Sequence, residues 1–287
     1  MRALVLSAGG SRGAFSVGNL KHLLYDLQIH YDCICGVSVG AINAAFLGMF
    51  KQGFEQEASD TLEKWWLRLD TKKIYKNWKY FGMLAALWKP SVYDSTPLHQ
   101  LLKSNLDLGK IQQSGKKICV GTVNLNSGKY MVFDQTSSNF VDAVIASASF
   151  PGMLSPIYFD GSWWSDGGSK TLSPIATAIE NGATHIDILF TSPEERNHSV
   201  IEMTNVFNIL HRSFDVSTDK ILSNDLEKLI MYNKLAAAGL TDKKVITYNI
   251  IRPDTNLISN SLDFDPVKIR DMIDLGYNKA KLVMSNI

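Results

Sequence analysis

A chain of 287 residues can form one large domain or two small ones, and its 45% hydrophobic and 20% charged residues are ordinary for a globular protein. The formal net charge of +1 excludes a general attraction to nucleic acid, so no nucleic-acid partner is expected. No apolar run approaches the roughly 18 residues of a membrane-spanning helix, and residues 1–6 are too short a run for a signal sequence. We therefore expect a cytoplasmic protein.

The N-terminal part alternates apolar strands with helices, which the sequence predicts at 3–7, 14–27, 31–36 and 39–52. This strand–helix order is typical of a parallel sheet covered by helices on both faces.

The junction between the second strand and its helix has the pattern Gly-x-Ser-x-Gly, with Ser38 between Gly36 and Gly40. Glycines at these two places remove Cβ atoms that would collide in a nucleophile elbow. Such an elbow holds the serine hydroxyl at a helix N-terminus, which favours developing negative charge. An ordinary glycine-rich turn is the alternative, but the flanking strand and Ala-rich helix favour a catalytic serine.

The first strand–helix junction, Ala8-Gly9-Gly10-Ser11-Arg12-Gly13, also exposes backbone N–H groups to an anion. A dinucleotide loop fails because Ala8 breaks Gly-x-Gly-x-x-Gly, and no Lys-Ser/Thr follows Gly13 as a P-loop requires. Beside an elbow, this turn would instead make a good oxyanion hole, since acyl transfer needs preorganised donors for the tetrahedral oxygen.

Residues 54–105 differ from the rest and are predicted to form an inserted helical cap. Within them, residues 64–89 hold seven basic residues, one acid and four of the six tryptophans. This composition is typical of a segment at a membrane surface, so we expect peripheral membrane contact there. The alternative, a cap whose tryptophans pack on the body, is favoured for Trp65 and Trp66, whereas Trp78, Phe81 and Trp88 favour the interface.

The remainder continues the α/β pattern without repeats or linkers, so we expect a single domain over residues 1–287. A hairpin is predicted at 117–134, where Asn126-Ser127-Gly128 forms the turn. The last helix begins after Asp265, with Pro266 at its first position. The other predicted elements are helices at 140–148 and 174–181, strands within 150–165, at 186–190 and at 245–251, and two helices within 200–238.

The three cysteines are Cys33, Cys35 and Cys119, and we expect reduced, buried thiols. No histidine or carboxylate stands near them at ligand spacing, so no metal site is expected.

An elbow serine needs a proton acceptor. None of the later histidines, at 99, 185, 198 and 211, stands in a loop beside an acidic residue. Asp166 differs because it lies between the aromatic strand end Trp163-Trp164 and Gly167-Gly168, where glycines allow a close approach. On these residues alone, an ordinary turn aspartate remains the alternative.

Three segments, 9–13, 36–40 and 166–168, have the order and spacing found in the patatin-like phospholipases, and residues 146–156 also resemble that family. The resemblance covers most of residues 3–190. It implies a three-layer α/β/α fold with a mostly parallel sheet, and hydrolysis of lipid acyl esters by a Ser–Asp dyad without histidine, metal or cofactor.

By this resemblance Ser38 is the nucleophile and Asp166 the base, and the expected substrate is a phospholipid or lysophospholipid. Gly9, Gly10 and Ser11 would supply oxyanion-hole N–H groups, with Arg12 holding the loop. One departure is Ala8, where many members have glycine.

Two other functions are alternatives to this one. A catalytically reduced, regulatory or membrane-binding member of the family is disfavoured because all three motifs are intact. A His-dependent esterase is disfavoured because the elbow follows only the second strand, at residue 38.

Overall fold

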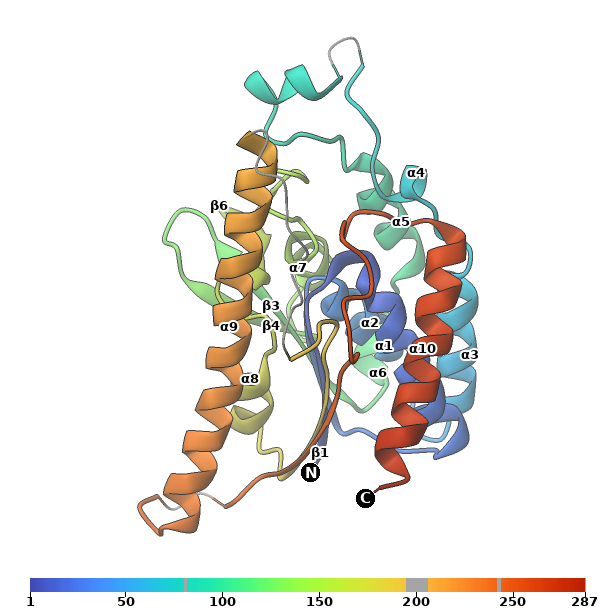
Figure 1. Cartoon of the computed structure of the whole chain (residues 1–287), viewed down its shortest axis with the longest axis vertical. Coiled ribbons are helices and arrows are strands. Elements are labelled where there is room, and N and C mark those ends of the chain that lie inside the picture. The colour runs from blue at the N-terminus through green and yellow to red at the C-terminus, as the bar shows by residue number, and fades with distance from the viewer. Residues whose placement is uncertain (80–81, 195–205, 242–243, 287) are drawn as a thin grey trace.

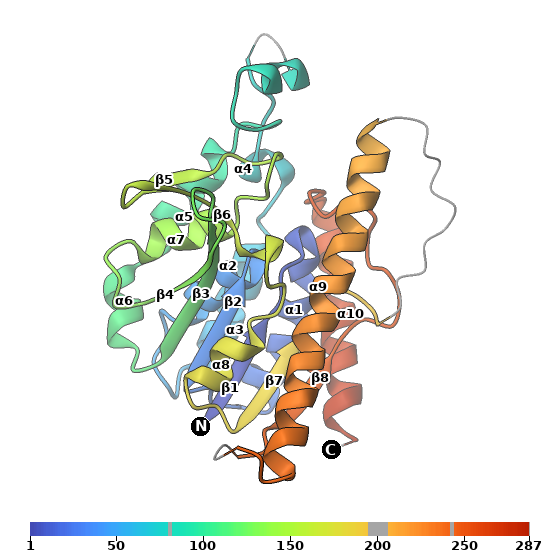
Figure 2. The same cartoon turned by 90° about the vertical axis from the view of Figure 1, so that its left-hand side faces the viewer.

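The computed structural model describes residues 1–79, 82–194, 206–241 and 244–286. In these residues an eight-stranded sheet lies between two layers of helices (Figure 1, Figure 2). The predicted three-layer α/β/α fold is therefore confirmed. The strands are β1 (Arg2–Leu6), β2 (Cys33–Val37), β3 (Lys117–Asn124), β4 (Tyr130–Asp134), β5 (Ile157–Phe159), β6 (Ser162–Asp166), β7 (His185–Leu189) and β8 (Thr247–Ile251).

The strand order is β5-β6-β3-β2-β1-β7-β8, with β4 also paired to β3. The five strands from β3 to β8 in this order run parallel, whereas β4, β5 and β6 are antiparallel to their partners. The carboxyl ends of the parallel strands therefore meet at one edge of the sheet, which is where open α/β sheets bind their ligands.

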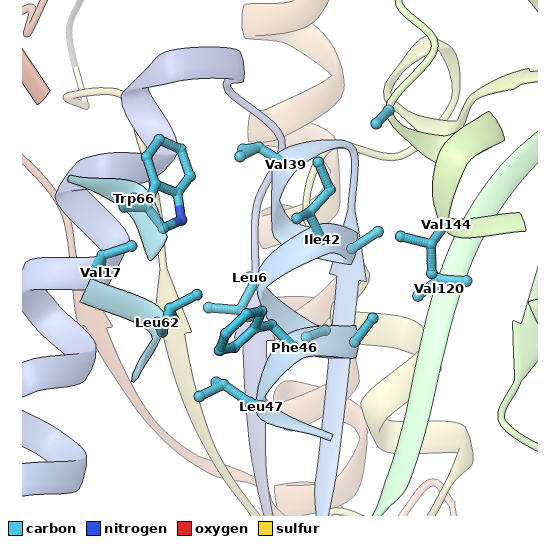
Figure 3. Packing of buried hydrophobic residues seen from close by; sticks show 14 of the residues in the cluster. Leu6, Val17, Val39, Ile42, Phe46, Leu47, Leu62, Trp66, Val120 and Val144 are labelled. Atoms are coloured by element: carbon cyan, nitrogen blue, oxygen red, sulfur yellow. The ribbon is translucent and has the colours of Figure 1, made fainter. Parts of the chain in front are cut away.

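Most of the helices cover one face of the sheet, where side chains from alternate strand positions form the larger apolar core. Figure 3 shows Leu6 and Val120 from the sheet in this core, with Phe46, Leu62 and Trp66 from the helices. The helices of this layer are α1 (Gly13–Leu20), which continues as the π-helical η2 (Lys21–Asp26), α2 (Val39–Leu47), α3 (Glu55–Trp66), α7 (Phe140–Ser147) and α10 (Pro266–Met284).

The opposite face is covered by α8 (Ile175–Glu180) and the long α9 (Val206–Ala237) (Figure 2). The prediction of two helices within 200–238 is wrong for the described residues, because α9 is one helix of 32 residues. It contains no glycine or proline that would end it. Residues 200–205 of that prediction lie outside the described residues.

The last helix begins as predicted, because the Asp265 side chain accepts the N–H groups of Val267 and Lys268 at 2.8 and 3.1 Å. None of the helices in the described part of the chain combines the length and the apolarity that crossing a bilayer requires.

The segment predicted as a cap is not uniform in its packing. Its helix α3 packs against α1, α2 and η2, and Trp66 is fully buried there. Farther along, η3 (Gly82–Leu87) projects from the end of the molecule (Figure 1, top). The helix α4 (Thr71–Ile74) precedes η3, and α5 (Thr96–Asn105) and α6 (Leu108–Gln113) follow it. The division of the chain into one domain with a cap stays a prediction.

Candidate active site

Strand β3 brings Ser38 and Asp166 together. One of its edges pairs with β4, and the other pairs with β2 as far as Val37 opposite Gly121. From the next residue on, β6 takes over this edge, with Asp166 opposite Thr122. Ser38, which directly follows Val37, is therefore held next to Asp166, although the two lie far apart in sequence.

The turn at Ser38 has the geometry of a nucleophile elbow. Ser38 has φ 57° and ψ −127°, which is a strained backbone for a residue with a side chain. A Cβ at Gly36 would overlap the carbonyl of Gly40, and a Cβ at Gly40 would overlap the carbonyl of Leu6. Both glycines are thus required for the turn, and α2 begins directly after the serine.

The Asp166 carboxyl group is 4% exposed and accepts the Gly168 N–H at 2.7 Å. Burial raises its pKa to about 7, although the Gly168 N–H and the Ser38 hydroxyl hydrogen-bond the carboxylate and oppose that rise. A carboxylate with this pKa can take up a proton near neutral pH, which an ordinary aspartate does poorly. A Cβ at Gly167 would overlap the Gly121 carbonyl, so this turn can lie against β3 only with glycine there.

The glycine-rich loop after β1 lines the same cavity as Ser38 and Asp166. Among the described residues, no acceptor takes the N–H of Gly9 or Gly10, so both donors are available to a ligand. The N–H of Ser11 instead donates to the carbonyl of Ser261 at 2.8 Å. Contrary to the expectation from the resemblance, Ser11 is therefore not free to serve an oxyanion.

Several side chains hold this loop in place. Arg12 Nε donates to the Gly9 carbonyl at 3.2 Å, a contact of the kind expected from a residue that holds the loop. Gly13 begins α1, where a Cβ would meet the side chain of Val39. Ala8 does not adopt a positive φ, and its N–H donates to the Leu172 carbonyl at 2.9 Å, so alanine fits there.

Thr191 and Ser261 also fix the loop, and the sequence analysis did not find either of them. The Thr191 hydroxyl donates to the Ala8 carbonyl at 2.5 Å and leaves no room for a Cβ at Gly9. Thr191 could have been found, because it follows the buried strand at 186–190 and the carboxyl ends of parallel strands meet. Ser261 stands in a loop without any pattern.

None of the histidines in the described residues is placed to serve Ser38. His185 begins β7 at the opposite edge of the sheet and contacts Thr247 Oγ1 at 2.8 Å. His99 contacts Ser95 Oγ at 3.1 Å. His198 and the side chain of His211 lie outside the described residues. No histidine of the described part of the chain lines the cavity that holds Ser38 and Asp166.

The rest of the cavity wall is mostly apolar. Its lining includes Ile42, Leu69, Ile74, Leu98, Leu154 and Phe264. A mostly apolar cavity with a few convergent polar groups at one end suits a hydrocarbon chain that carries a single polar reactive group.

Ser147 is a further residue that the sequence analysis did not single out. Its hydroxyl is buried at the end of α7, accepts the Ser38 N–H at 2.8 Å and donates to the Gly121 carbonyl at 2.6 Å. It thereby ties the elbow to the part of β3 that aligns Asp166.

Replacing Ser147 with alanine is expected to lower kcat by about tenfold to a hundredfold with little change in KM, because the buried Ser38 N–H loses its acceptor and the elbow its alignment. The matched control is Ser149→Ala. Ser149 is equally buried, but its hydroxyl donates only to the Ile145 carbonyl, at 2.9 Å, and does not touch Ser38. Ester turnover and melting temperature are measured for both. Equal loss of kcat in the two variants would show that Ser147 has no positioning role.

Comparisons with known proteins show what the chain is similar to. The sequence profile described as patatin-like phospholipase matches residues 4–179. Uncharacterized protein R571 of Acanthamoeba polyphaga mimivirus is 27% identical over 214 residues, which are 70% of this chain and 69% of that protein. The probable lipid hydrolase 463L of Invertebrate iridescent virus 6 is 23% identical over 274 residues, or 87% and 92% of the two chains.

Calcium-independent phospholipase A2-gamma of Mus musculus is 26% identical over 205 residues, which are 62% of this chain but only 26% of that protein. Among solved structures, VipD from Legionella pneumophila has a TM-score of 0.45 at 12% identity, over 99% of this chain and 67% of that one.

The match over residues 4–179 spans more than half of the chain, and it contains all three motifs that carry the resemblance. The chain belongs to the patatin-like phospholipase family, a class of lipid hydrolases.

Proposed function

We propose that the protein is a lipid acyl hydrolase that cleaves carboxylic esters of phospholipids or lysophospholipids through a Ser38–Asp166 dyad. In the first step Asp166 takes the proton of the Ser38 hydroxyl while the serine oxygen attacks the acyl carbonyl. The free N–H groups of Gly9 and Gly10 then stabilise the negatively charged oxygen of the tetrahedral intermediate.

Collapse of this intermediate breaks the ester bond, and Asp166 returns the proton to the leaving alcohol. Water, with Asp166 again as base, then cleaves the acyl-enzyme and releases the fatty acid. The observation that supports this mechanism best is the buried Asp166 carboxylate, with its pKa raised to about 7, hydrogen-bonded to the hydroxyl of a strained elbow serine.

A fluorophosphonate probe and a panel of defined lipids test the proposal together. We expect stoichiometric labelling of Ser38, and release of fatty acid from phospholipid or lysophospholipid. The family's regulatory alternative predicts a folded protein that neither reacts with the probe nor turns over any lipid, and this result would overturn the proposal.

We also propose that the projecting segment around η3 contacts the membrane surface. Leu87, at the end of η3, and the next residue, Trp88, are 75% and 71% exposed. The η3 segment lies at the end of the molecule toward which the parallel strands run (Figure 1). Trp65 packs on Phe46 and Trp66 is buried, whereas Trp78 is half-buried and donates to the Ser91 carbonyl at 3.0 Å. Trp88 is therefore the tryptophan that supports the proposal, and Phe81 lies outside the described residues.

Charge supports the same proposal. Lys73 and Lys76 contact Asp70 and Asp94, but Lys72 and Lys79 form no ion pair within the described residues. Unpaired lysines in the same stretch of chain as an exposed tryptophan are suited to anionic lipid headgroups. Cytoplasmic location with reversible membrane binding remains our prediction.

Replacing Lys72 and Lys79 with glutamate is expected to weaken binding to anionic liposomes by roughly thirtyfold or more, since the loss of each lysine removes about 1 kcal/mol and each glutamate adds repulsion. The matched control is Lys228→Glu with Lys234→Glu, which changes the net charge equally but toward the far end of α9 (Figure 1). Binding is measured by sedimentation with liposomes. An equal effect of both pairs would contradict a local contact.

A further inference from the structure

All three cysteines of the chain converge at one place, remote from the proposed dyad. Cys35 and Cys119 are direct partners on the neighbouring parallel strands β2 and β3, and Cys33 stands two residues before Cys35 on the same face. The three sulfur atoms lie within 4.8 Å of one another, and those of Cys33 and Cys35 are 3.6 Å apart. All three side chains are buried, and none forms a disulfide.

The convergence follows from the pleat of the sheet. Residues 33 and 35 point to the same face because alternate residues of a strand do so, and the register of β2 with β3 adds Cys119 beside them. This face of the sheet is covered by α8, whose Ile175 and Ala178 belong to the same buried apolar cluster as the three cysteines. No metal site was expected from the sequence, because no histidine or carboxylate stands at ligand spacing. The position of Cys119 beside the other two cysteines follows only from the pairing of β2 with β3.

A polar side chain also reaches the sulfur atoms. At the edge of the group, Asn181 Nδ2 donates to Cys119 Sγ at 3.7 Å. Cysteine binds metals as thiolate, so a metal ion at this group would displace the thiol protons.

We propose that Cys33, Cys35 and Cys119 form a binding site for a soft, thiophilic metal ion, with Cu(I) as the ion that fits best. Thiolates select Cu(I) and Zn(II) among biological cations, but structural zinc takes four ligands, and the group within the described residues offers three. A metal bonded to three sulfurs at about 2.3 Å needs them about 4 Å apart, a spacing that the observed separations bracket.

Binding of Cu(I) exchanges thiol protons for metal–sulfur bonds. Cu(I) displaces the thiol protons, so each ion bound releases protons to the solvent while three Cu–S bonds form and the copper keeps its oxidation state. Lys117 lies at the edge of the group, but its ammonium contacts the Asp134 carboxylate, so this pair adds little net charge beside the thiolates.

The test is a titration of the reduced, anaerobic protein with Cu(I) in competition with a chromophoric Cu(I) chelator. We expect uptake of one Cu(I) per chain, release of two to three protons per ion, and three sulfur neighbours by X-ray absorption. Replacing Cys35 or Cys119 with alanine should weaken binding at least tenfold, and replacing both should abolish it.

The matched control is Val5→Ala. Val5 is the register partner of Cys35 on β1 and shares its face of the sheet, but it offers no sulfur, so Cu(I) uptake should be unchanged. Melting temperatures of the metal-free variants establish that they fold, and the proton count on the unaltered protein requires no variant. Failure of the folded, unaltered protein to take up one equivalent, or equal uptake by the double cysteine variant, would overturn the proposal.

Discussion

Replacing Ser38 with alanine is expected to abolish acyl-ester hydrolysis, by roughly four orders of magnitude or more, because no other oxygen can form the acyl-enzyme. The fold should persist, since the Ser38 side chain faces a cavity and its backbone N–H still donates to Ser147. Alanine also keeps the strained backbone at this position about as well as serine does.

This prediction is checked by p-nitrophenyl ester turnover, fluorophosphonate labelling and thermal unfolding of the same preparation. The Ser149→Ala variant is the control, because it also removes one buried hydroxyl but leaves the elbow intact. Near-normal turnover by a folded Ser38→Ala protein would end the assignment of Ser38 as nucleophile.

Replacing Asp166 with asparagine is expected to reduce turnover by about 10³-fold or more. The amide oxygen can still accept the Gly168 N–H, but it cannot take a proton from Ser38. The variant should be at least as stable as the unaltered protein above pH 7. The folded pKa of about 7 lies above the ordinary value, so ionisation of the buried carboxyl disfavours the folded state, and asparagine removes that cost.

The pH profile gives an independent readout of the same residue. Because Asp166 must be ionised to act as base, kcat/KM of the unaltered protein should fall as the pH drops below about 7. Single alanine replacements at His99, His185, His198 and His211 should change turnover only slightly. One histidine variant as inactive as Ser38→Ala would instead support a His-dependent esterase.

How much of this protein could be predicted from sequence depends on how local each feature is. The elbow is local, because the glycines two residues before and after Ser38 report the steric demand of the turn itself. The strand and helix alternation is local in the same sense, and the structure confirms the three-layer fold that it predicts. The predicted start of α10 at Pro266, after the Asp265 cap, is also local and is confirmed.

These local patterns did not predict that α9 is one continuous helix. Periodicity showed helix over residues 200–238, but the division into two helices had no glycine or proline to support it. The sequence already distinguished the packed Trp66 from the exposed Trp88. It did not show that Trp78 is half-buried and donates to the Ser91 carbonyl, because that contact depends on how the segment folds back on itself.

What only the tertiary structure decided is which distant residues meet. Ser38 and Asp166 meet because the same edge of β3 pairs with β2 up to Gly121 and with β6 from Thr122 on. This pairing depends on strand register, which no single segment of the sequence reveals. The Ser11 N–H donates to the carbonyl of Ser261, 250 residues away in sequence. Fewer N–H groups of the loop are therefore available to a ligand than its motif implies. Cys119 joins the other two cysteines through the same register. Backbone pairing acts between segments, so a sequence determines it only through the whole fold.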